Sequence, residues 1–235
     1  MRGRAFVDDL KAASERAMNE INSSDYHDFV FRDGKLVGEF EQMYRKSKDV
    51  PWHQDREAER IDCRVALDIA QASHCVDAKI AEVGCGLGFF ADLLSQRFPQ
   101  AEVTGFDISD TAILKAGQFF PHIKFEVMDI TGKTQSVDTY DLVCIRGCFW
   151  YLFHEIDLVA ANLTELVQSR GHLLIAQNFP PLDKPYVGRE AIPSPEALIN
   201  RFLPAFDPII DCRLDDKSSV GGNDNWVIFL GRKKV

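Results

Sequence analysis

The feature that most constrains the fold of this 235-residue chain is a glycine-rich turn in the segment IAEVGCGLGFF, which begins at Ile80. The apolar residues before the turn predict the end of a buried strand, and a helical stretch is expected after Gly88. Glycines at alternate positions from Gly84 to Gly88 keep side chains out of the turn, so a ligand can approach its backbone closely. Phe89 replaces the third glycine of a dinucleotide fingerprint. The turn therefore predicts a nucleotide-binding α/β fold whose ligand differs from the usual dinucleotides.

Strand and helix patterns alternate from residue 78 to about residue 178. Such alternation implies parallel strands joined by right-handed crossovers, with helices in the first, second and fourth intervals. Two further β-like runs lie near the C-terminus, and the segment 218–222, rich in serine and glycine, predicts an antiparallel hairpin at one sheet edge. The predicted strands cover residues 78–83, 102–106, 123–128, 140–145, 172–177, 208–214 and 225–230. We therefore expect a Rossmann-like α/β fold with a seven-stranded, mostly parallel sheet.

The chain is expected to divide into a helical N-terminal cap at residues 1–77 and the α/β domain at residues 78–235. Five prolines between residues 178 and 196 exclude a regular helix, so we interpret this loop as a lid. A short helix is expected after it, at residues 195–202. Helical spacing of apolar residues predicts amphipathic helices of the cap at about residues 6–21, 40–44 and 55–72.

The charge of the chain argues against nucleic acid and membrane surfaces as partners. Its formal net charge is −9, so its field repels phosphate backbones and anionic lipid head groups. No apolar run is long enough for a signal peptide or a membrane helix, and we expect a cytoplasmic protein with a small-molecule partner. A monomer or a homodimer is expected.

Six cysteines are spread over the chain, mostly in apolar or glycine-rich surroundings, and are interpreted as reduced core residues. Only Cys144 and Cys148 are near neighbours, and they lack the paired ligands of a closed zinc site. We therefore predict no metal site.

Acidic residues follow two of the predicted strands and indicate what the glycine turn binds. Asp107 lies 23 residues beyond Gly84 and closes the motif GFD, where a carboxylate can accept both hydroxyls of a ribose. Asp129, in the motif VMDI, can accept hydrogen bonds from an exocyclic amine, while Ile108 and Ile130 sandwich a flat ring. Because the carboxyl ends of parallel strands meet at one edge, these residues predict a nucleoside site.

The motifs EVGCGLG, GFDIS, VMDI and YDLVCIRGCFWYL resemble the successive motifs of class I S-adenosylmethionine-dependent methyltransferases. The resemblance covers about residues 78–178 and implies S-adenosyl-L-methionine as cofactor, S-adenosyl-L-homocysteine as product and an antiparallel final strand. It implies that the methionine and ribose part of the cofactor is lined by Glu82, Gly84, Cys85 and Gly86.

The same resemblance assigns the remaining contacts to the cofactor. Asp107 would hold the ribose hydroxyls and Ile108 would cover the adenine. Asp129 and the Ile130 backbone would bind the adenine edge. The sulfonium would be bordered by Arg146 and Gly147.

The segment GEFEQMYRKSKDVPWHQDREAERIDCR resembles the N-terminal part of nodulation-type N-methyltransferases and of methyltransferases from surface-polysaccharide biosynthesis, although Val50 interrupts their Asp-Pro-Trp motif. The resemblance implies that Tyr44, Trp52 and Arg60 close over the methionine end of the cofactor. Arg60 is expected to bind the cofactor carboxylate with two hydrogen bonds. The resemblance of this segment also points to a sugar or amino-sugar acceptor. Trp52 is equally typical of an aromatic side chain that only packs the cap.

Methyl transfer from a sulfonium is an in-line displacement, so the protein mainly aligns the acceptor, the methyl group and the sulfur. A hydroxyl acceptor needs a base, and we expect His154 or His53 in this role because histidine titrates near neutral pH. An amine acceptor needs only to bind in its neutral form. Both histidines are also typical of surface residues without function. Methylation at oxygen and methylation at nitrogen both remain open.

Two other functions share parts of this pattern. A glycine turn followed by an acid also occurs in NAD(P)-binding oxidoreductases, although Phe89 and Asp129 argue against that class. A non-catalytic subunit that binds S-adenosylmethionine is the second alternative, and it predicts a blocked acceptor cleft.

Overall fold

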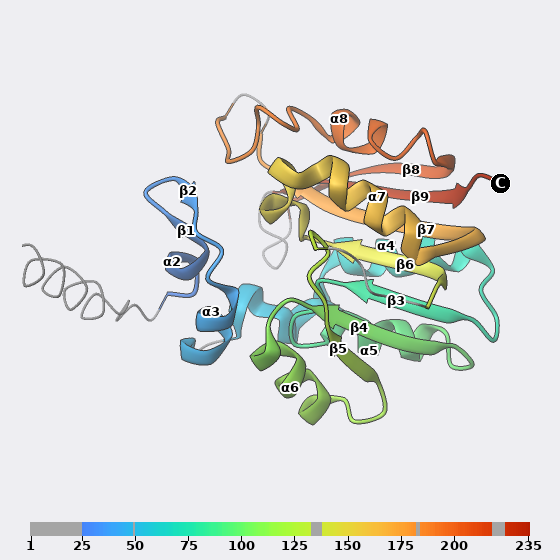
Figure 1. Ribbon diagram of the computed structural model, residues 1–235, viewed down its shortest axis with the longest axis horizontal. Helices are drawn as coiled ribbons and strands as arrows, with labels where there is room; N and C mark the ends of the chain where they lie inside the picture. The colour runs from blue at the N-terminus through green and yellow to red at the C-terminus, as the bar shows by residue number, and fades with distance from the viewer. Residues whose placement is uncertain (1–24, 49, 133–137, 182–183, 218–223) are drawn as a thin grey trace, which may run out of the picture.

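A seven-stranded sheet forms the centre of the computed structural model, which describes residues 25–48, 50–132, 138–181, 184–217 and 224–235 (Figure 1). The strands lie in the order β5-β4-β3-β6-β7-β9-β8, and β9 runs in the direction opposite to the other six. The prediction of an α/β sheet with an antiparallel final strand is confirmed. The predicted turn at 218–222 lies outside the described residues, as does the helix predicted at 6–21. The strands are β3 (Lys79–Val83), β4 (Glu102–Asp107), β5 (Lys124–Val127), β6 (Tyr140–Arg146), β7 (Val167–Phe179), β8 (Phe206–Asp216) and β9 (Asp224–Lys233).

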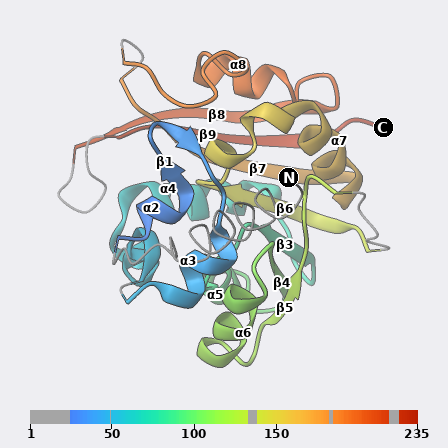
Figure 2. The same cartoon turned by 60° about the vertical axis from the view of Figure 1, so that its left-hand side comes forward.

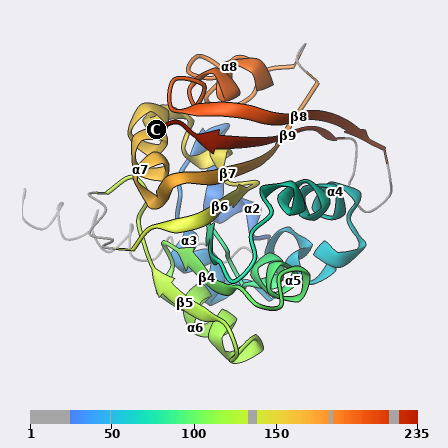
Figure 3. The ribbon, with the colours of Figure 1, turned by 90° about the vertical axis from the view of Figure 1, so that its right-hand side faces the viewer.

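Helices cover both faces of the sheet (Figure 3). One face packs against α4 and α5, and its core contains Leu67, Phe90 and Ile80. The other face packs against α7 and α8, and its core contains Val159 and Leu198. The central strands β3 and β6 are buried on both faces, as is typical of parallel strands covered by helices. The helices after the first β-strand of the sheet are α5 (Phe89–Arg97), α6 (Asp110–Phe119), η3 (Phe149–Tyr151), η4 (Phe153–Glu155), α7 (Ile156–Leu166) and α8 (Pro195–Asn200), and α4 (Ile61–Ala70) and η2 (Gln71–Ser73) precede it.

The N-terminal elements stand over the carboxyl ends of the strands (Figure 2). The helix predicted at 40–44 is confirmed, but the single helix predicted at 55–72 is wrong. The chain is extended at Arg60, with φ −76° and ψ 134°, and α4 beyond it packs on the sheet. We call residues 25–60 the cap segment, because they cover the strand ends. Its elements are α2 (His27–Val30), β1 (Phe31–Arg32), β2 (Lys35–Leu36), α3 (Phe40–Lys46) and η1 (Pro51–Glu59).

Candidate active site

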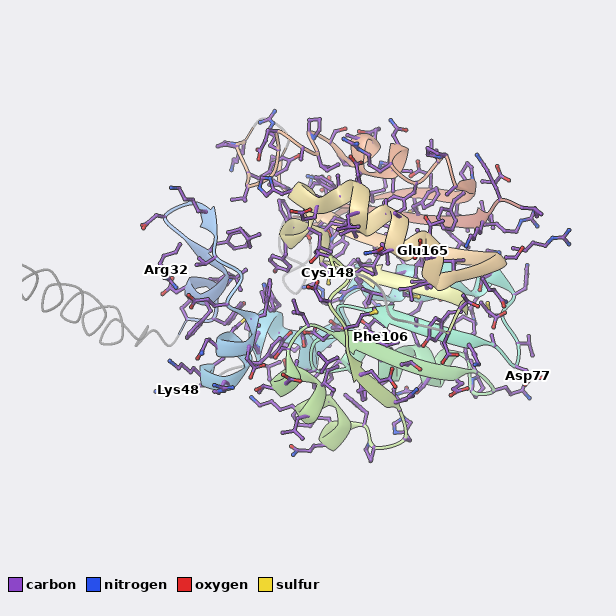
Figure 4. The ribbon with its side chains drawn as sticks, in the orientation of Figure 1. Arg32, Lys48, Asp77, Phe106, Cys148 and Glu165 are labelled. Carbon is purple, nitrogen blue, oxygen red and sulfur yellow. The ribbon has the colours of Figure 1, made fainter. Side chains whose placement is uncertain are left out.

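A cavity of about 1210 Å³ lies between the cap segment and the carboxyl ends of β3, β4 and β6. Figure 4 labels Cys148, one of its lining residues, just beyond β6, on the side of the sheet that faces the cap segment. Asp77, at the opposite edge of the molecule, lies far from it. Of the residues predicted to bind the cofactor, Gly86 is the one that does not line the cavity. The others that line it are Tyr44, Trp52, Arg60, Glu82, Gly84, Cys85, Asp107, Ile108, Asp129, Ile130, Arg146 and Gly147.

The cap segment rests directly on the glycine turn. Gly86 has φ +54°, and a Cβ atom there would lie 2.6 Å from the Tyr44 hydroxyl and 2.7 Å from Gln54 Oε1. Gln54 Oε1 also accepts a hydrogen bond of 2.9 Å from the backbone N–H of Leu87. The absence of a side chain at Gly86 therefore makes room for the cap segment, whereas the turn faces the cavity through Gly84 and Cys85.

Asp107 is fixed at the end of β4 by two backbone hydrogen bonds. Its Oδ2 accepts from the N–H of Gly86 and its Oδ1 from the N–H of Ser109, both at 2.9 Å. Burial raises the pKa of this carboxyl, and the backbone donors oppose that rise. Each oxygen retains a lone pair, because a carboxylate oxygen accepts about two hydrogen bonds. This geometry suits a carboxylate that accepts from a pair of hydroxyls.

The opposite end of the cavity is lined by two isoleucines and by Asp129. Ile108 is 51% exposed at the rim, and Ile130 is buried. Asp129 Oδ1 accepts hydrogen bonds from the N–H and the hydroxyl of Thr131, at 2.9 and 2.6 Å. Asn162 Nδ2 donates to the carbonyl of Ile130 and so fixes the backbone whose N–H was predicted to bind a base edge. Apolar side chains beside a carboxylate acceptor suit a flat ring that carries an exocyclic amine.

A charged cluster closes the third side of the cavity. Arg146 donates to Glu57 Oε1 at 3.0 Å and to Asp62 Oδ2 at 2.6 Å, and Arg60 Nε donates to Asp62 Oδ1 at 3.0 Å. Both guanidinium groups lie over the ring of Trp226, at 5.3 and 5.7 Å from its centroid. Arg146, which the resemblance placed beside the sulfonium, is therefore held mainly by the cap segment and α4.

Two carboxylate oxygens of this region are buried without a hydrogen-bond partner among the described residues. They are Oε2 of Glu57 and Oε2 of Glu82. Burial is the largest cause that raises the pKa of both carboxyls. Repulsion from Asp62 adds to the rise at Glu57, and repulsion from Glu57 adds to the rise at Glu82. Both residues line the cavity, so a cationic group of a ligand would satisfy them. The sequence analysis missed Glu57. Its neighbours are both acidic and basic residues, and nothing in this pattern indicates which of the glutamates is buried.

Aromatic rings form the wall on the side of the cap segment. Trp52 lies 5.4 Å from Tyr26 and 5.9 Å from Tyr151 between ring centroids, and Tyr151 contacts Phe40 at 4.9 Å. Trp52 and His53 have φ of +53° and +52°, a conformation that is costly for residues with a Cβ atom. This strained turn within η1 places Trp52 in the cavity wall.

The two candidate bases occupy different positions. His53 lines the cavity, as expected. His154 does not: its side chain is 53% exposed and its Nδ1 lies 3.5 Å from Glu190. The tight turn of η4 instead directs the next residue, Glu155, to the cavity lining. The structure therefore corrects the expectation that His154 faces the acceptor.

The loop that was interpreted as a lid is packed through Tyr186. Its ring lies 5.4 Å from that of Trp150 and 6.1 Å from that of Phe179, and its hydroxyl donates to the carbonyl of Ile192. Trp150 Nε1 donates to Asn178 Oδ1 at 2.9 Å. Tyr186, Trp150 and Asn178 all line the cavity, so this loop forms its fourth wall.

Three features of the described residues concern metals, disulfides and membranes. Among the described residues, no group of three or more His, Cys, Asp or Glu side chains is arranged to hold a metal ion. All six cysteines are free thiols. No helix in the described part of the chain has the length and apolarity needed to span a membrane.

Comparison with known proteins shows which proteins the central part of the chain resembles. Residues 80–171 match the family model described as a methyltransferase domain. The chain is 31% identical over 114 residues to a trans-aconitate 2-methyltransferase of Variovorax paradoxus, covering 48% of this chain and 40% of that protein. It is 31% identical over 100 residues to a malonyl-[acyl-carrier protein] O-methyltransferase of Bacillus anthracis, covering 42% and 36%. The chain thus aligns with less than half the length of these curated relatives.

Solved structures with the same fold extend the likeness beyond the central domain. The N-methyltransferase NodS of Bradyrhizobium japonicum, in complex with S-adenosyl-L-homocysteine, has a TM-score of 0.60 at 19% identity, covering 80% of this chain and 90% of that one. A putative sarcosine dimethylglycine methyltransferase of Galdieria sulphuraria has a TM-score of 0.63 at 12% identity, covering 81% and 96%. At identities below 25% these structures show the fold of this chain, and the sequence match relates residues 80–171 to methyltransferase domains.

Proposed function

We propose that the protein transfers a methyl group from S-adenosyl-L-methionine to an oxygen or nitrogen of a small molecule. The observation that carries this proposal is the convergence of Gly84, Asp107 and Asp129 on one cavity that the cap segment covers. These residues fit the cofactor: Asp107 suits its ribose, and Asp129 with Ile108 suits its adenine. The unpartnered oxygen of Glu82 suits its ammonium group.

The cofactor, when bound, supplies an activated methyl group on sulfur. The protein then has to hold the acceptor in line with the methyl group and to exclude water from it. Trp52 and Tyr151 lie on the cap side of the cavity, where they would do both. An amine acceptor attacks as the free base and loses its proton to water, whereas a hydroxyl acceptor needs His53 or Glu155 to take its proton.

For the acceptor we propose a sugar or amino sugar, as used in polysaccharide biosynthesis. Aromatic side chains make up much of the wall, and such rings stack on sugar faces. The lysine and arginine residues of the cavity lining are Arg60 and Arg146, and both are paired with carboxylates. The charge of each arginine is thus balanced by a carboxylate, so an anion such as trans-aconitate, named for a relative, would meet no uncompensated Lys or Arg charge among the described lining residues. The charge of the cavity thus favours a neutral or cationic acceptor.

Two measurements test these proposals in turn. S-adenosyl-L-homocysteine should raise the melting temperature of the purified protein and NAD should not; a shift with NAD alone would overturn the cofactor assignment. Transfer of radiolabelled methyl groups should then be detected with nucleotide sugars, amino sugars or small amines. Labelling of trans-aconitate alone would contradict the proposed acceptor class, and absence of all transfer despite binding would favour a non-catalytic subunit.

A further inference from the structure

The charged cluster beside the cavity contains one more carboxylate than it has guanidinium groups. Its carboxylates belong to Glu57, Asp62 and Glu82, and its guanidinium groups to Arg60 and Arg146. Arg146 is 9% exposed at its side chain, and Asp62 is fully buried, so water screens these charges little. A fully ionised cluster would therefore carry one uncompensated negative charge in a poorly solvated site.

The uncompensated charge can be located from the hydrogen bonds. Both oxygens of Asp62 are occupied, one by Arg60 and one by Arg146. Glu57 uses only Oε1, toward Arg146, and its Oε2 is buried without a partner in the described structure. Glu82 Oε2 is in the same state. Glu57 and Glu82 line the cavity, whereas Asp62 does not. The missing positive charge is thus expected from the cavity.

We propose that Glu57 of the cap segment, together with Glu82, binds the ammonium group of the cofactor's amino-acid end, and that binding displaces one proton from this pair. This inference rests on the proposed function, because it takes S-adenosylmethionine as the ligand. The proton balance is closed: one carboxyl group gives its proton to solvent, and the ammonium group forms N–H···O bonds to the vacated oxygens.

Charged groups of both signs face the pair, and the arginines favour ionised glutamates whereas the carboxylates oppose them. Arg146, Asp62 and Arg60 face Glu57, whereas Glu57, Arg146 and Asp107 face Glu82. Burial raises the pKa of both glutamates above the ordinary value, despite Arg146. Burial likewise raises the pKa of the neighbouring thiols, so they stay neutral and add no charge. These thiols are Cys63, Cys85, Cys144 and Cys148.

The proposal gives the cap segment a share in recognising the cofactor. Glu57 precedes the chain break at Arg60, and Asp62 follows it, so both reach Arg146 from different elements. An uninterrupted helix would place residues 57 and 62 on different faces, since five residues turn a helix by about 500°. The break at Arg60 therefore assembles the cluster.

Two ligands that differ only at the amino-acid end provide the first test. Isothermal titration of the whole protein with S-adenosyl-L-homocysteine and with 5′-methylthioadenosine is performed in buffers of different ionisation enthalpy. The buffer should change the apparent enthalpy for S-adenosyl-L-homocysteine, which reports proton release, and should leave that for 5′-methylthioadenosine unchanged. Equal proton release with both ligands, or none with either, would overturn the inference. Absence of binding by both ligands would instead reject the proposed cofactor.

A pair of neighbouring variants provides the second test. Glu57→Gln should weaken binding of S-adenosyl-L-homocysteine by roughly 10- to 100-fold, as expected for one charge-assisted hydrogen bond, and should abolish its proton release. Binding of 5′-methylthioadenosine should change little and shows that the variant is folded. Glu59→Gln removes an exposed carboxylate, paired with Arg56, from the same element and should alter neither ligand. Unchanged proton release in Glu57→Gln would contradict the role of Glu57. If that variant does not fold, the comparison of the two ligands on the wild-type protein still tests whether binding of the amino-acid end releases a proton.

Discussion

Two carboxylates join the cap segment to the rest of the molecule, and they do so in opposite ways. Glu41 of α3 accepts hydrogen bonds from the hydroxyl of Ser109 and from the N–H and hydroxyl of Thr111, at 2.6 to 3.0 Å. Arg45 completes its set of partners. Glu57 of η1 has one arginine partner and one buried oxygen with none among the described residues. Glu41 is satisfied by the protein alone, whereas Glu57 is satisfied fully only by a ligand.

The ionisation of the two groups differs accordingly. Burial acts to raise the pKa of Glu41, but the donors from Ser109 and Thr111 prevail and lower it to about 2. Burial dominates at Glu57, and its pKa is raised. A carboxylate whose hydrogen bonds are all formed in the folded protein stabilises it. A buried carboxylate oxygen without a partner costs stability, and such groups are retained where ligand binding uses them. The comparison separates a structural contact of the cap segment from a proposed functional one.

Removing the shared arginine should have the largest effect on stability. Arg146→Met leaves Glu57 and Asp62 buried without their cation, and we expect a loss of about 3–5 kcal/mol in the free energy of unfolding. Urea denaturation measures it. Arg45→Met, which removes the exposed partner of Glu41, is the control and should cost less than about 1 kcal/mol. Equal losses would show that burial does not distinguish the two contacts.

A methyl group on the glycine turn should have the next largest effect, because it meets the cap segment. In Gly86→Ala the new Cβ atom meets Tyr44 and Gln54 at a residue with positive φ, and we expect a loss of about 3 kcal/mol. Gly34→Ala is the matched control, since Gly34 also has positive φ, at +72°, but no neighbour within 4 Å. It should lose only the backbone strain, about 1 kcal/mol. A Gly86→Ala protein as stable as the control would show that the cap segment can move aside freely.

Substitution of the satisfied carboxylate should have a moderate, pH-dependent effect. Glu41→Gln should cost about 1 kcal/mol at pH 7, after allowance for its partial exposure. A lowered pKa stabilises the folded protein above the ordinary value of 4.5, and this contribution is lost as the pH falls toward 2. The difference in unfolding free energy between wild type and Glu41→Gln should therefore shrink across that range. A constant difference would contradict the assignment.

Substitution of the unsatisfied carboxylate should have the smallest effect on stability, and the opposite dependence on pH. A raised pKa means that Glu57 stabilises the folded protein below the ordinary value of 4.5 and loses this contribution as the pH rises through its folded-state pKa. Glu57→Gln should therefore gain stability relative to wild type as the pH rises, within about 1 kcal/mol at pH 7. Unfolding curves from pH 4 to pH 8, without ligand, measure this trend. If the difference in unfolding free energy between wild type and variant changed with pH in the same direction for Glu57→Gln as for Glu41→Gln, the two contacts would not differ as described.

The sequence was sufficient to predict the sheet and to predict which residues of its strand ends line the cavity. Apolar runs of strand length located the seven strands, and Gly84, Asp107 and Asp129 lie at strand ends whose position follows from topology. The half of the site on the cap segment was not predictable in the same way. The chain break at Arg60 and the burial of Glu57 depend on ion pairs to Arg146, 89 residues from Glu57 in the sequence. His154 was misplaced because a single tight turn decides whether residue 154 or 155 faces the cavity.

The aromatic side chains of the cavity wall also determine the fluorescence of the protein. The chain contains three tryptophans, and all of them line the cavity: Trp52 on the cap side, Trp150 beside the loop of Tyr186, and Trp226 under the charged cluster. The tryptophan fluorescence of the protein therefore originates entirely at the cavity wall. Single Trp→Phe variants would divide this emission into three reporters, one for each side of the bound ligands, without any attached dye.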